Sequence, residues 1–470
     1  MTRRSAPCAL GAALVLLGLA ACGGGSGTAS DTGSETPTGD VSDPDPGDAS
    51  DPGGRPDPGG TPDPGGGAVE LTGDGPDDQP APVALEDVSA LEDHLAATAA
   101  LGADAVTQAL NDPETDTIVV SPSSLATALA MMAAGAEGVT RAELEEVLGG
   151  ADSDVLEAIQ SLRSELADLD QDPATIELDP LPDRAIVHMA NQVVLRSDVT
   201  PEQTWLDAVS HRLGAGVVAT PFEAMQQVLD DWVDLHTAGL VDESGIEARP
   251  ETVLVVQDAV LVASAWLDGF SESATTEEDY TLPGGDIVQV PTMHGQRPMP
   301  YAEVDGHRAV ELALLDGLVL EVVLPADGTA PGELTAEDWA ALADALDPGA
   351  PALVDLALPR ADLETSVALA PVLDPVGVVE LFGPAPELGR MLPGDGYVVD
   401  QAVQQARLQI GEEGVVAAAV TEIAVAESAQ LPPEEEVELV VDRPYAVRIV
   451  DGGTGWVLFH AAIGDPRGEE

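Results

Sequence analysis

Hydrophobic residues along the chain recur first with a helical spacing and later with the spacing of strands. Residues 85–110 have apolar side chains three and four positions apart, which predicts an amphipathic helix. The stretch TIVV predicts a short buried strand, and the Ala-rich residues after it predict a buried helix. A further helix is expected in TRAELEEVLGG, with Thr140 as N-cap and Glu143 three residues later, and another in DDWVDLHTAGLV.

Longer strands are predicted in the second half of the chain. TVLVVQDAVLVASAW, residues 252–266, is rich in β-branched residues and predicts a central strand buried on both faces. AVELALLDGLVLEVVLP predicts a hairpin with Asp316 and Gly317 at its turn. PALVDLALPRADLETSV predicts a strand that leads out through Pro359, and residues 437–466 predict three strands with a Gly-rich turn. Early helices and later strands favour one α+β domain.

The stretch GEEGVVAAAVTEIAVAESAQLPP, residues 411–433, fits two structures. Between residues 415 and 426 its one charged residue is Glu422. In a strand, alternate side chains share a face, and Glu422 falls on the opposite face from the uncharged set Val415, Ala417, Ala419, Thr421, Ile423 and Val425. A surface helix is the alternative, because Ala and Glu are strong helix formers.

Composition excludes several classes of function. The chain has 85 acidic residues against 17 basic ones, all arginine, so neither nucleic acid nor a heparin-like polyanion is expected as a partner. Cys8 and Cys22 lie near the start, so the folded part has no disulfide or cysteine-ligated zinc, and no metal or cofactor is expected. The seven histidines show no HExxH spacing, and no GxSxG or phosphate-loop lysine occurs, so an enzyme is not expected.

The N-terminus has the pattern of a processing signal. Arg3 and Arg4 precede an apolar run that ends in LAAC at Cys22, which resembles a bacterial lipobox. We therefore expect a lipoprotein signal peptide at residues 1–21, lipidation of Cys22 and an extracellular location, anchored to the surface of a bacterial membrane. Ordinary secretory cleavage with an incidental Cys22 is the alternative. Residues 22–84 are rich in Gly, Pro and Asp and predict a disordered linker.

Several segments in a fixed order resemble the serpins, a family of serine-protease inhibitors. Together they span residues 86–466. They are SPSSLATAL at 121–129, GAEGVT at 135–140, Ala190-Asn191, RLGAGVVATPF at 212–222, Trp232-Val233 with Thr237 and Gly239, residues 252–266 ending in Trp266, Leu358-Pro359-Arg360, residues 377–382, Arg443-Pro444-Tyr445, and Asp465-Pro466.

The resemblance implies an α+β serpin fold in residues 85–466, with helices packed on three β-sheets and an exposed reactive-centre loop, followed by a tail at 467–470. It also implies a monomer that acts as a suicide-substrate inhibitor of serine proteases. The protease is acylated at a loop bond, and the loop then inserts as a strand into the central sheet. A non-inhibitory serpin that serves as a binding or structural lipoprotein of the cell envelope is the alternative.

The resemblance places the hinge of this loop in the stretch at 411–433. Its residues are Glu412, Gly414, Val415, Ala417, Ala418 and Ala419. Counting along the loop puts the reactive bond between Ser428 and Ala429, and the prolines that follow suggest Ala429-Gln430 instead. Either residue is small, and the stretch contains no Arg or Lys, so an elastase-like or subtilisin-like protease is the expected target rather than a trypsin-like one.

Two residues depart from the family pattern where the sheet is expected to open. Asp258 stands where the family usually has Asn, and Gln404 where it usually has His. In the family these positions form a hydrogen-bond network with those of Ser121 and Ser124. A bond from Gln404 to Asp258 is expected to rebuild it, and the carboxyl group is expected to make opening sensitive to pH. Trp266 is expected at the top of the same sheet, and a plain core role fits it equally well.

Overall fold

A computed structural model describes residues 69–70, 81–113, 115–178, 180–346, 351–394, 396–416 and 436–468. In these ranges, no helix is both long enough and apolar enough to cross a membrane. The eight α-helices found there are α1 Leu91–Ala109, α2 Pro122–Gly135, α3 Gly138–Val147, α4 Asp152–Glu165, α5 Gln203–Leu213, α6 Phe222–His236, α7 Ala336–Ala345 and α8 Leu369–Leu373.

Three sheets hold the strands. The largest has the order β1-β4-β3-β5-β14-β13-β12, the second β2-β17-β16-β10-β9-β8, and the smallest β15-β11-β7-β6. The strands are β1 Val69–Glu70, β2 Ile118–Val120, β3 Ile186–Arg196, β4 Gly216–Thr220, β5 Leu254–Ala265, β6 Thr276–Thr281, β7 Ile287–Met299, β8 Tyr301–Val304, β9 His307–Ala313, β10 Leu318–Leu324, β11 Ala352–Pro359, β12 Ala361–Ala368, β13 Val403–Ile410, β14 Gly414–Val415, β15 Glu436–Val440, β16 Tyr445–Asp451 and β17 Val457–Ile463.

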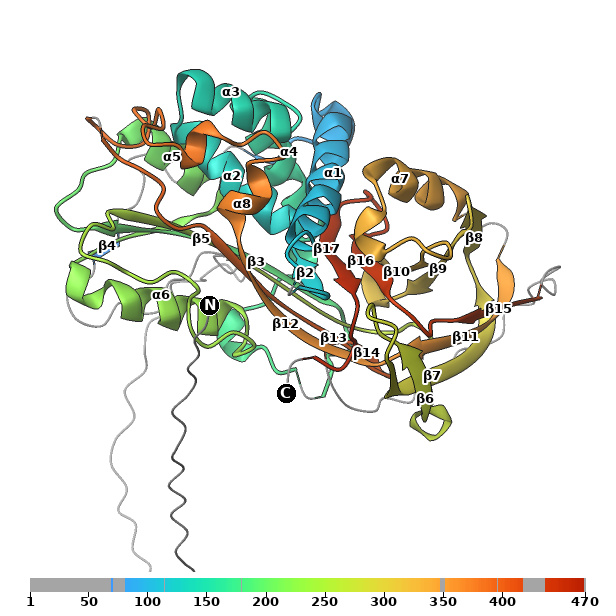
Figure 1. Ribbon diagram of the computed structural model, residues 1–470. Coiled ribbons are helices and arrows are strands. Elements are labelled where there is room, and N and C mark those ends of the chain that lie inside the picture. The colour runs from blue at the N-terminus through green and yellow to red at the C-terminus, as the bar shows by residue number, and fades with distance from the viewer. Residues whose placement is uncertain are drawn as a thin grey trace, which may run out of the picture. The chain divides into compact units, whose positions relative to one another are not determined.

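Helices cover both faces of the seven-stranded sheet. Figure 1 shows α2, α4 and α5 grouped on one side of it, with α6 lying across the other. On that second side Trp232 of α6 packs on Ala190 of β3 and Ala259 of β5. Since directly opposite residues of paired strands share a face, β3 and β5 together form the platform on which α6 lies.

The hairpin and the C-terminal strands follow the sequence prediction. β9 and β10 pair in antiparallel register, and Asp316 and Gly317 at the turn have φ angles of 55° and 88°. These left-handed angles suit the Asp-Gly turn of a two-stranded hairpin. The predicted C-terminal strands are β15, β16 and β17.

Two local predictions were wrong. Helix α3 begins at Gly138 with Glu137 as its N-cap, and Thr140 lies inside the helix, where its hydroxyl group accepts a bond from the Glu387 amide. Strand β5 is not buried on both faces along its first half: its residues alternate between buried and partly exposed positions. The reason is that one edge of β5 borders a groove, described next, and pairs there only with the short strand β14.

Candidate functional site

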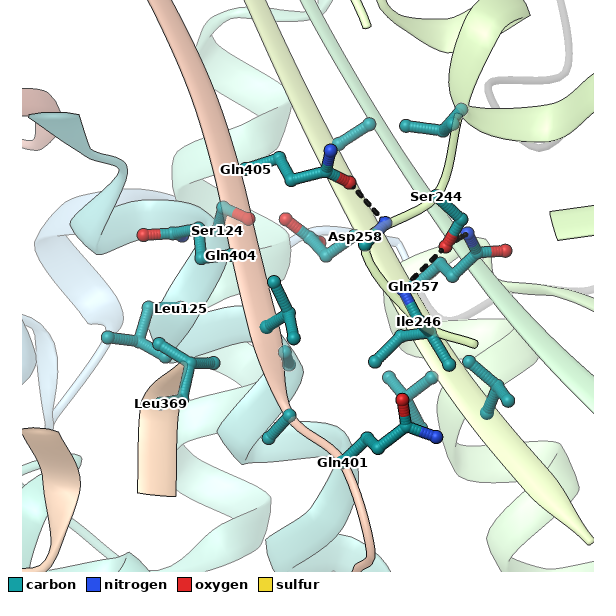
Figure 2. A pocket seen from close by; sticks show the side chains of 18 of the residues that line it. Ser124, Leu125, Ser244, Ile246, Gln257, Asp258, Leu369, Gln401, Gln404 and Gln405 are labelled. Carbon is teal, nitrogen blue, oxygen red and sulfur yellow. Dashed lines mark hydrogen bonds between the residues drawn. The ribbon is translucent and has the colours of Figure 1, made fainter. Parts of the chain in front are cut away.

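A groove separates β5 from β13 within the seven-stranded sheet. β5 pairs with β3 and β14, and β13 pairs with β12 and β14, so in the described chain the two long strands meet only through β14. The groove has a volume of about 530 Å³ and is lined by residues 253–262 and 403–408, among others. Figure 2 shows Asp258 and Gln257 on one wall and Gln404 and Gln405 on the other. Beyond β14, each of the two strands therefore turns toward the groove an edge that pairs with no other described strand.

The predicted hinge enters this groove from one end. Gly414 and Val415 form β14, in which Gly414 pairs with Ala265 and Val415 with Ser264, antiparallel to β5. The same residue, Val415, pairs with Ile410 of β13, and its side chain has no exposed surface. The hinge thus already makes the first rungs of a strand between β5 and β13.

The backbone is strained where the chain leaves this short strand. Val416 has a φ of 67°, in the left-handed region that β-branched residues avoid. Such a conformation costs about 1–3 kcal/mol. The strain would be relieved if Val416 became extended and continued β14.

Gly414→Ala is expected to push the hinge out of the sheet. A Cβ atom at this position would clash with the carbonyl oxygen of Ser264, and overpacking of this kind costs about 1–3 kcal/mol. Trp266 would then lose its contact with the hinge, and its fluorescence should shift to longer wavelength. Gly411→Ala is the matched control, because no neighbouring atom lies within 4 Å of its Cβ position. An unshifted spectrum for Gly414→Ala would contradict the assignment.

Trp266 anchors the hinge at the end of β5. Its indole Nε1 donates to the Gly411 carbonyl oxygen over 2.8 Å, and its main-chain N donates to Glu413 over the same distance. The ring lies edge-on to Phe270, with centroids 6.1 Å apart, and Phe270 N donates to Glu412 O. Trp266 is therefore both a core residue and a hinge contact.

Glu412 is held by two partners that the sequence did not reveal. Its buried carboxylate accepts hydrogen bonds from Arg360 and from the hydroxyl group of Thr275. Burial acts to raise the pKa of Glu412, but the bonds from Arg360 and Thr275 outweigh it and hold the pKa below its ordinary value. The ion pair fixes the turn between β13 and β14 to the end of β11, where Arg360 follows Pro359.

The predicted sheet-opening residues separate into two groups. Gln404 accepts from Ser121 N over 3.1 Å and donates to Ser121 O over 2.9 Å, so it binds the start of α2 instead of Asp258. The Ser121 hydroxyl caps α2 by accepting from Ser124 N and donates to Leu458 O. Trp266 stands apart, about eight residues or roughly 26 Å along β5 from Asp258.

Asp258 carries an unusual carboxyl group in the groove wall. Desolvation raises its pKa to about 7, against a hydrogen bond from Ser124 and the charge of Arg163, which both act to lower it. Its remaining exposed surface faces the groove, and in the described part of the chain Oδ1 has no hydrogen-bond partner. The side chain can therefore change its charge near neutral pH at the position where a strand would enter.

A strap crosses the groove from α6 to β5; we define it as residues 240–249. Gln405 of β13 accepts from Gly245 N and donates to Glu243 O over 3.2 Å. Gln401, just before β13, accepts from Glu247 N over 3.1 Å and donates to Glu247 O over 2.8 Å. These two amide groups bind the strap much as a neighbouring strand would. Sequence reasoning missed both, since nothing near them in the chain identifies their partners.

The remaining predicted site residues lie outside the described part of the chain. They are Ala417, Ala418 and Ala419 of the hinge, Ser428 and Ala429 at the reactive bond, and Cys22. The structure describes Glu412, Gly414 and Val415 of the predicted hinge, and both the hinge and the reactive bond stay predictions.

Comparison with known proteins agrees with this architecture. A family model described as "Serpin (serine protease inhibitor)" matches residues 96–466. An uncharacterized serpin-like protein of Thermococcus kodakarensis is 26% identical, over 74% of this chain and 81% of the relative. An antitrypsin of Bombyx mori is also 26% identical, over 71% of this chain and 85% of the relative. The crystal structure of tengpin, a thermophilic serpin, in its native state has a TM-score of 0.68 at 19% identity, covering 79% of this chain and 94% of tengpin.

These matches confirm the predicted fold, with helices and several β-sheets in one arrangement. The family is consistent with a protease inhibitor rather than an enzyme. With a family model matching well over half of its length, the chain belongs to the serpin family.

Proposed function

We propose that the chain is a suicide-substrate inhibitor of serine proteases that acts by inserting its loop into the seven-stranded sheet. The observation that carries the proposal is the open groove between β5 and β13, with β14 already paired at its entrance. A strand that continued β14 would pair with both open edges at once. It would also relieve the strained backbone at Val416.

The proposed cycle begins when the protease nucleophile attacks the Ser428 carbonyl carbon. The bond to Ala429 breaks, the Ala429 nitrogen leaves with a proton, and an ester links Ser428 to the enzyme. Residues 416–426 then extend β14 along the groove. At roughly 3.3 Å per residue this carries the bound protease about 36 Å, and its distortion prevents water from releasing it.

The target follows from the small residue at the reactive bond. Ser428 or Ala429 offers a short side chain, which suits the shallow primary pocket of an elastase-like or subtilisin-like protease. The antitrypsin of Bombyx mori is named for trypsin. In this chain residues 411–433 contain no Arg or Lys to fill a trypsin pocket, so we propose that trypsin-like enzymes are not inhibited.

The proposal is tested by mixing the chain with subtilisin, elastase or trypsin and running a denaturing gel. A stable band at the summed mass of chain and protease, formed with subtilisin or elastase, supports inhibition. Loop cleavage without that band supports a non-inhibitory serpin. A cleaved chain that gains no thermal stability argues against insertion itself, because an added central strand should stabilise the fold.

Removing the strap contacts should speed insertion. The double variant with Gln401→Ala and Gln405→Ala loses bonds worth about 1–2 kcal/mol that hold the strap to the β13 side of the groove, so the cleaved chain should gain thermal stability about ten times faster. The readout is the rate of that gain after loop cleavage. Gln203→Ala, which removes an exposed amide bonded to Asp207 on α5, is the matched control. Equal rates for both variants would show that the strap offers no resistance.

The location of the inhibitor is proposed from the N-terminal sequence. We propose that Cys22 carries a lipid and that the chain is displayed on the outside of a bacterial membrane, with residues 22–84 as the tether. Incorporation of a labelled fatty acid into the wild-type chain but not into Cys22→Ser would support this. Release of both chains into the medium without label would support ordinary secretion.

A further inference from the structure

Two buried histidines and a partly exposed aspartate fasten helix α6 to strand β3. His188 Nδ1 lies 2.6 Å from Oδ1 of Asp170, and His188 Nε2 lies 2.8 Å from Nδ1 of His236. Neither histidine has exposed surface. Their rings are stacked, with centroids 5.1 Å apart. The ring of Trp232 packs against that of His236, with centroids 4.6 Å apart. We name Asp170, His188 and His236 the imidazole chain.

The imidazole chain lies where the sheet has to move. Through His236 it holds the end of α6 to β3, which is on the β5 side of the groove. The strap that follows α6 is bonded to Gln401 and Gln405 on the other side. A strand inserted between β5 and β13 separates the two sides by about 4.8 Å. Because α6 and its strap are attached to both, one attachment must break before insertion is complete.

The hydrogen atoms of the imidazole chain follow from its acceptors. A carboxylate oxygen accepts, so His188 Nδ1 carries a hydrogen that it donates to Asp170. When His188 is neutral, its Nε2 accepts from His236 Nδ1. One added proton goes to His236 Nε2, and the Nδ1 hydrogen of His236 passes to His188 Nε2. His188 is then a cation beside Asp170, its Nε2 donates, and His236 Nδ1 accepts. A second added proton puts hydrogens on both facing nitrogens, so the 2.8 Å contact is lost and two stacked cations repel each other.

We propose that the imidazole chain is a proton-dependent latch: it holds α6 on β3 with none or one added proton, and it releases α6 with two. Acidification would then speed the loop insertion proposed above, on which this consequence rests. Other charged groups on the elements packed here include Glu223, Asp230, Asp231 and Asp234 of α6, Asp168 of the 3-10 helix Ala167–Leu169, Asp172 before the 3-10 helix Pro173–Thr175, Arg163 of α4 near Asp170, Arg196 of β3, and Asp258 of β5. Asp258 pairs with Asn191, three residues from His188, so it lies on the opposite face of the sheet.

The latch is tested on the intact chain, without protease, by hydrogen exchange of the α6 amides. The range runs from about pH 8 to about pH 5, which brackets the ordinary histidine pKa of about 6.5. His236→Asn keeps an amide N–H donor near the position of Nδ1 but does not titrate. His236→Phe keeps a ring and removes the bond. Because all three chains retain Asp258 and the surface carboxylates, those contributions cancel in the comparison.

In the wild type we expect the exchange of α6, corrected for intrinsic rates, to rise about fivefold or more from pH 8 to pH 5, the effect of losing one buried hydrogen bond. His236→Asn should stay protected throughout, and His236→Phe should exchange fast at both ends. The proposed latch would be contradicted if the α6 amides of the wild type and of His236→Asn lost protection equally at low pH. It would also be contradicted if His236→Phe kept full protection. Should His236→Phe fail to fold, the comparison of wild type with His236→Asn still decides.

A second measurement separates the latch from the proposed function. The loop is cleaved and the rate at which thermal stability rises is followed at both pH values. A larger increase in this rate from pH 8 to pH 5 is expected for the wild type than for His236→Asn, because the contribution of Asp258 is common to both. If the hydrogen exchange of α6 depends on pH but the cleaved chain never gains thermal stability, the latch is kept and loop insertion is rejected. Insertion at equal rates in the wild type and His236→Asn at pH 5 would reject the latch as a control of insertion.

Discussion

Replacing Ala419 with Glu is expected to convert the chain from an inhibitor into a substrate that its protease cleaves and leaves. Val415 is fully buried in β14, and side chains alternate along a strand, so the proposed insertion carries Ala417 and Ala419 inward as well. An unpaired buried carboxylate costs several kcal/mol, and about 1.4 kcal/mol slows a step tenfold, so insertion should slow at least about 100-fold. The measurement is the number of chains consumed for each protease molecule inactivated.

Ala418→Glu is the matched control for this experiment. It adds the same charge one position earlier, on the side that turns outward during insertion, as Glu422 of the wild type is expected to do. The control should therefore keep most of the inhibitory capacity. Equal loss in both variants would show that the alternation does not continue from Val415, and the proposed register of the inserted strand would have to be abandoned.

Asp258→Asn is expected to stabilise the uncleaved chain at pH 8 by about 2–3 kcal/mol. The gain comes from the difference of about three between the pKa values of Asp258 in the folded and the unfolded chain. Loss of the contact between the Asp258 carboxylate and Ser124 reduces the gain. The pKa of Asp258 is raised from 3.8 to about 7 in the folded chain, which therefore binds more protons than the unfolded chain between these values. The stabilising contribution is complete below about pH 4, falls as pH rises, and is lost above about pH 7. The variant should not show this decline.

The measurement is the free energy of unfolding as a function of pH for the wild type and the variant. Taking the difference of the two curves removes the titration of the other acidic residues. Asp231→Asn, which removes an exposed carboxyl group on α6, should give a flat difference curve. A flat curve for Asp258→Asn as well would mean that the groove leaves this carboxylate hydrated.

Local patterns were sufficient for much of the fold. The Asp-Gly turn determines the register of β9 and β10, because a short turn allows the two strands only one way to pair. The same reasoning failed for β5, whose uninterrupted apolar sequence hides the fact that one edge borders a groove. It failed also at α3, where a plausible cap at Thr140 instead binds the distant Glu387 amide.

The candidate site was predictable only where the chain itself carries the constraint. The hinge was predicted because the resemblance to the serpins places it in a stretch of small uncharged residues. The ion pair between Arg360 and Glu412 could not be predicted. The two residues are 52 positions apart in the chain, and whether they meet depends on how three sheets are assembled. Gln405 and its strap partner Gly245 are 160 positions apart. The predicted bond from Gln404 to Asp258 was wrong, because the main chain of Ser121 binds both ends of the Gln404 amide.

The entry of β14 at a single end of the groove gives the inserted strand an obligatory order of growth. Each new residue pair can form only after the one before it. Pairing starts at Val416, where relief of the backbone strain favours the first step. A substitution near residue 417 that blocks pairing would then prevent every later pair from forming, while one near residue 426 would remove little more than its own pair. Tolerance to substitution should therefore form a gradient along the stretch, steepest beside the alanines and shallowest toward the reactive bond.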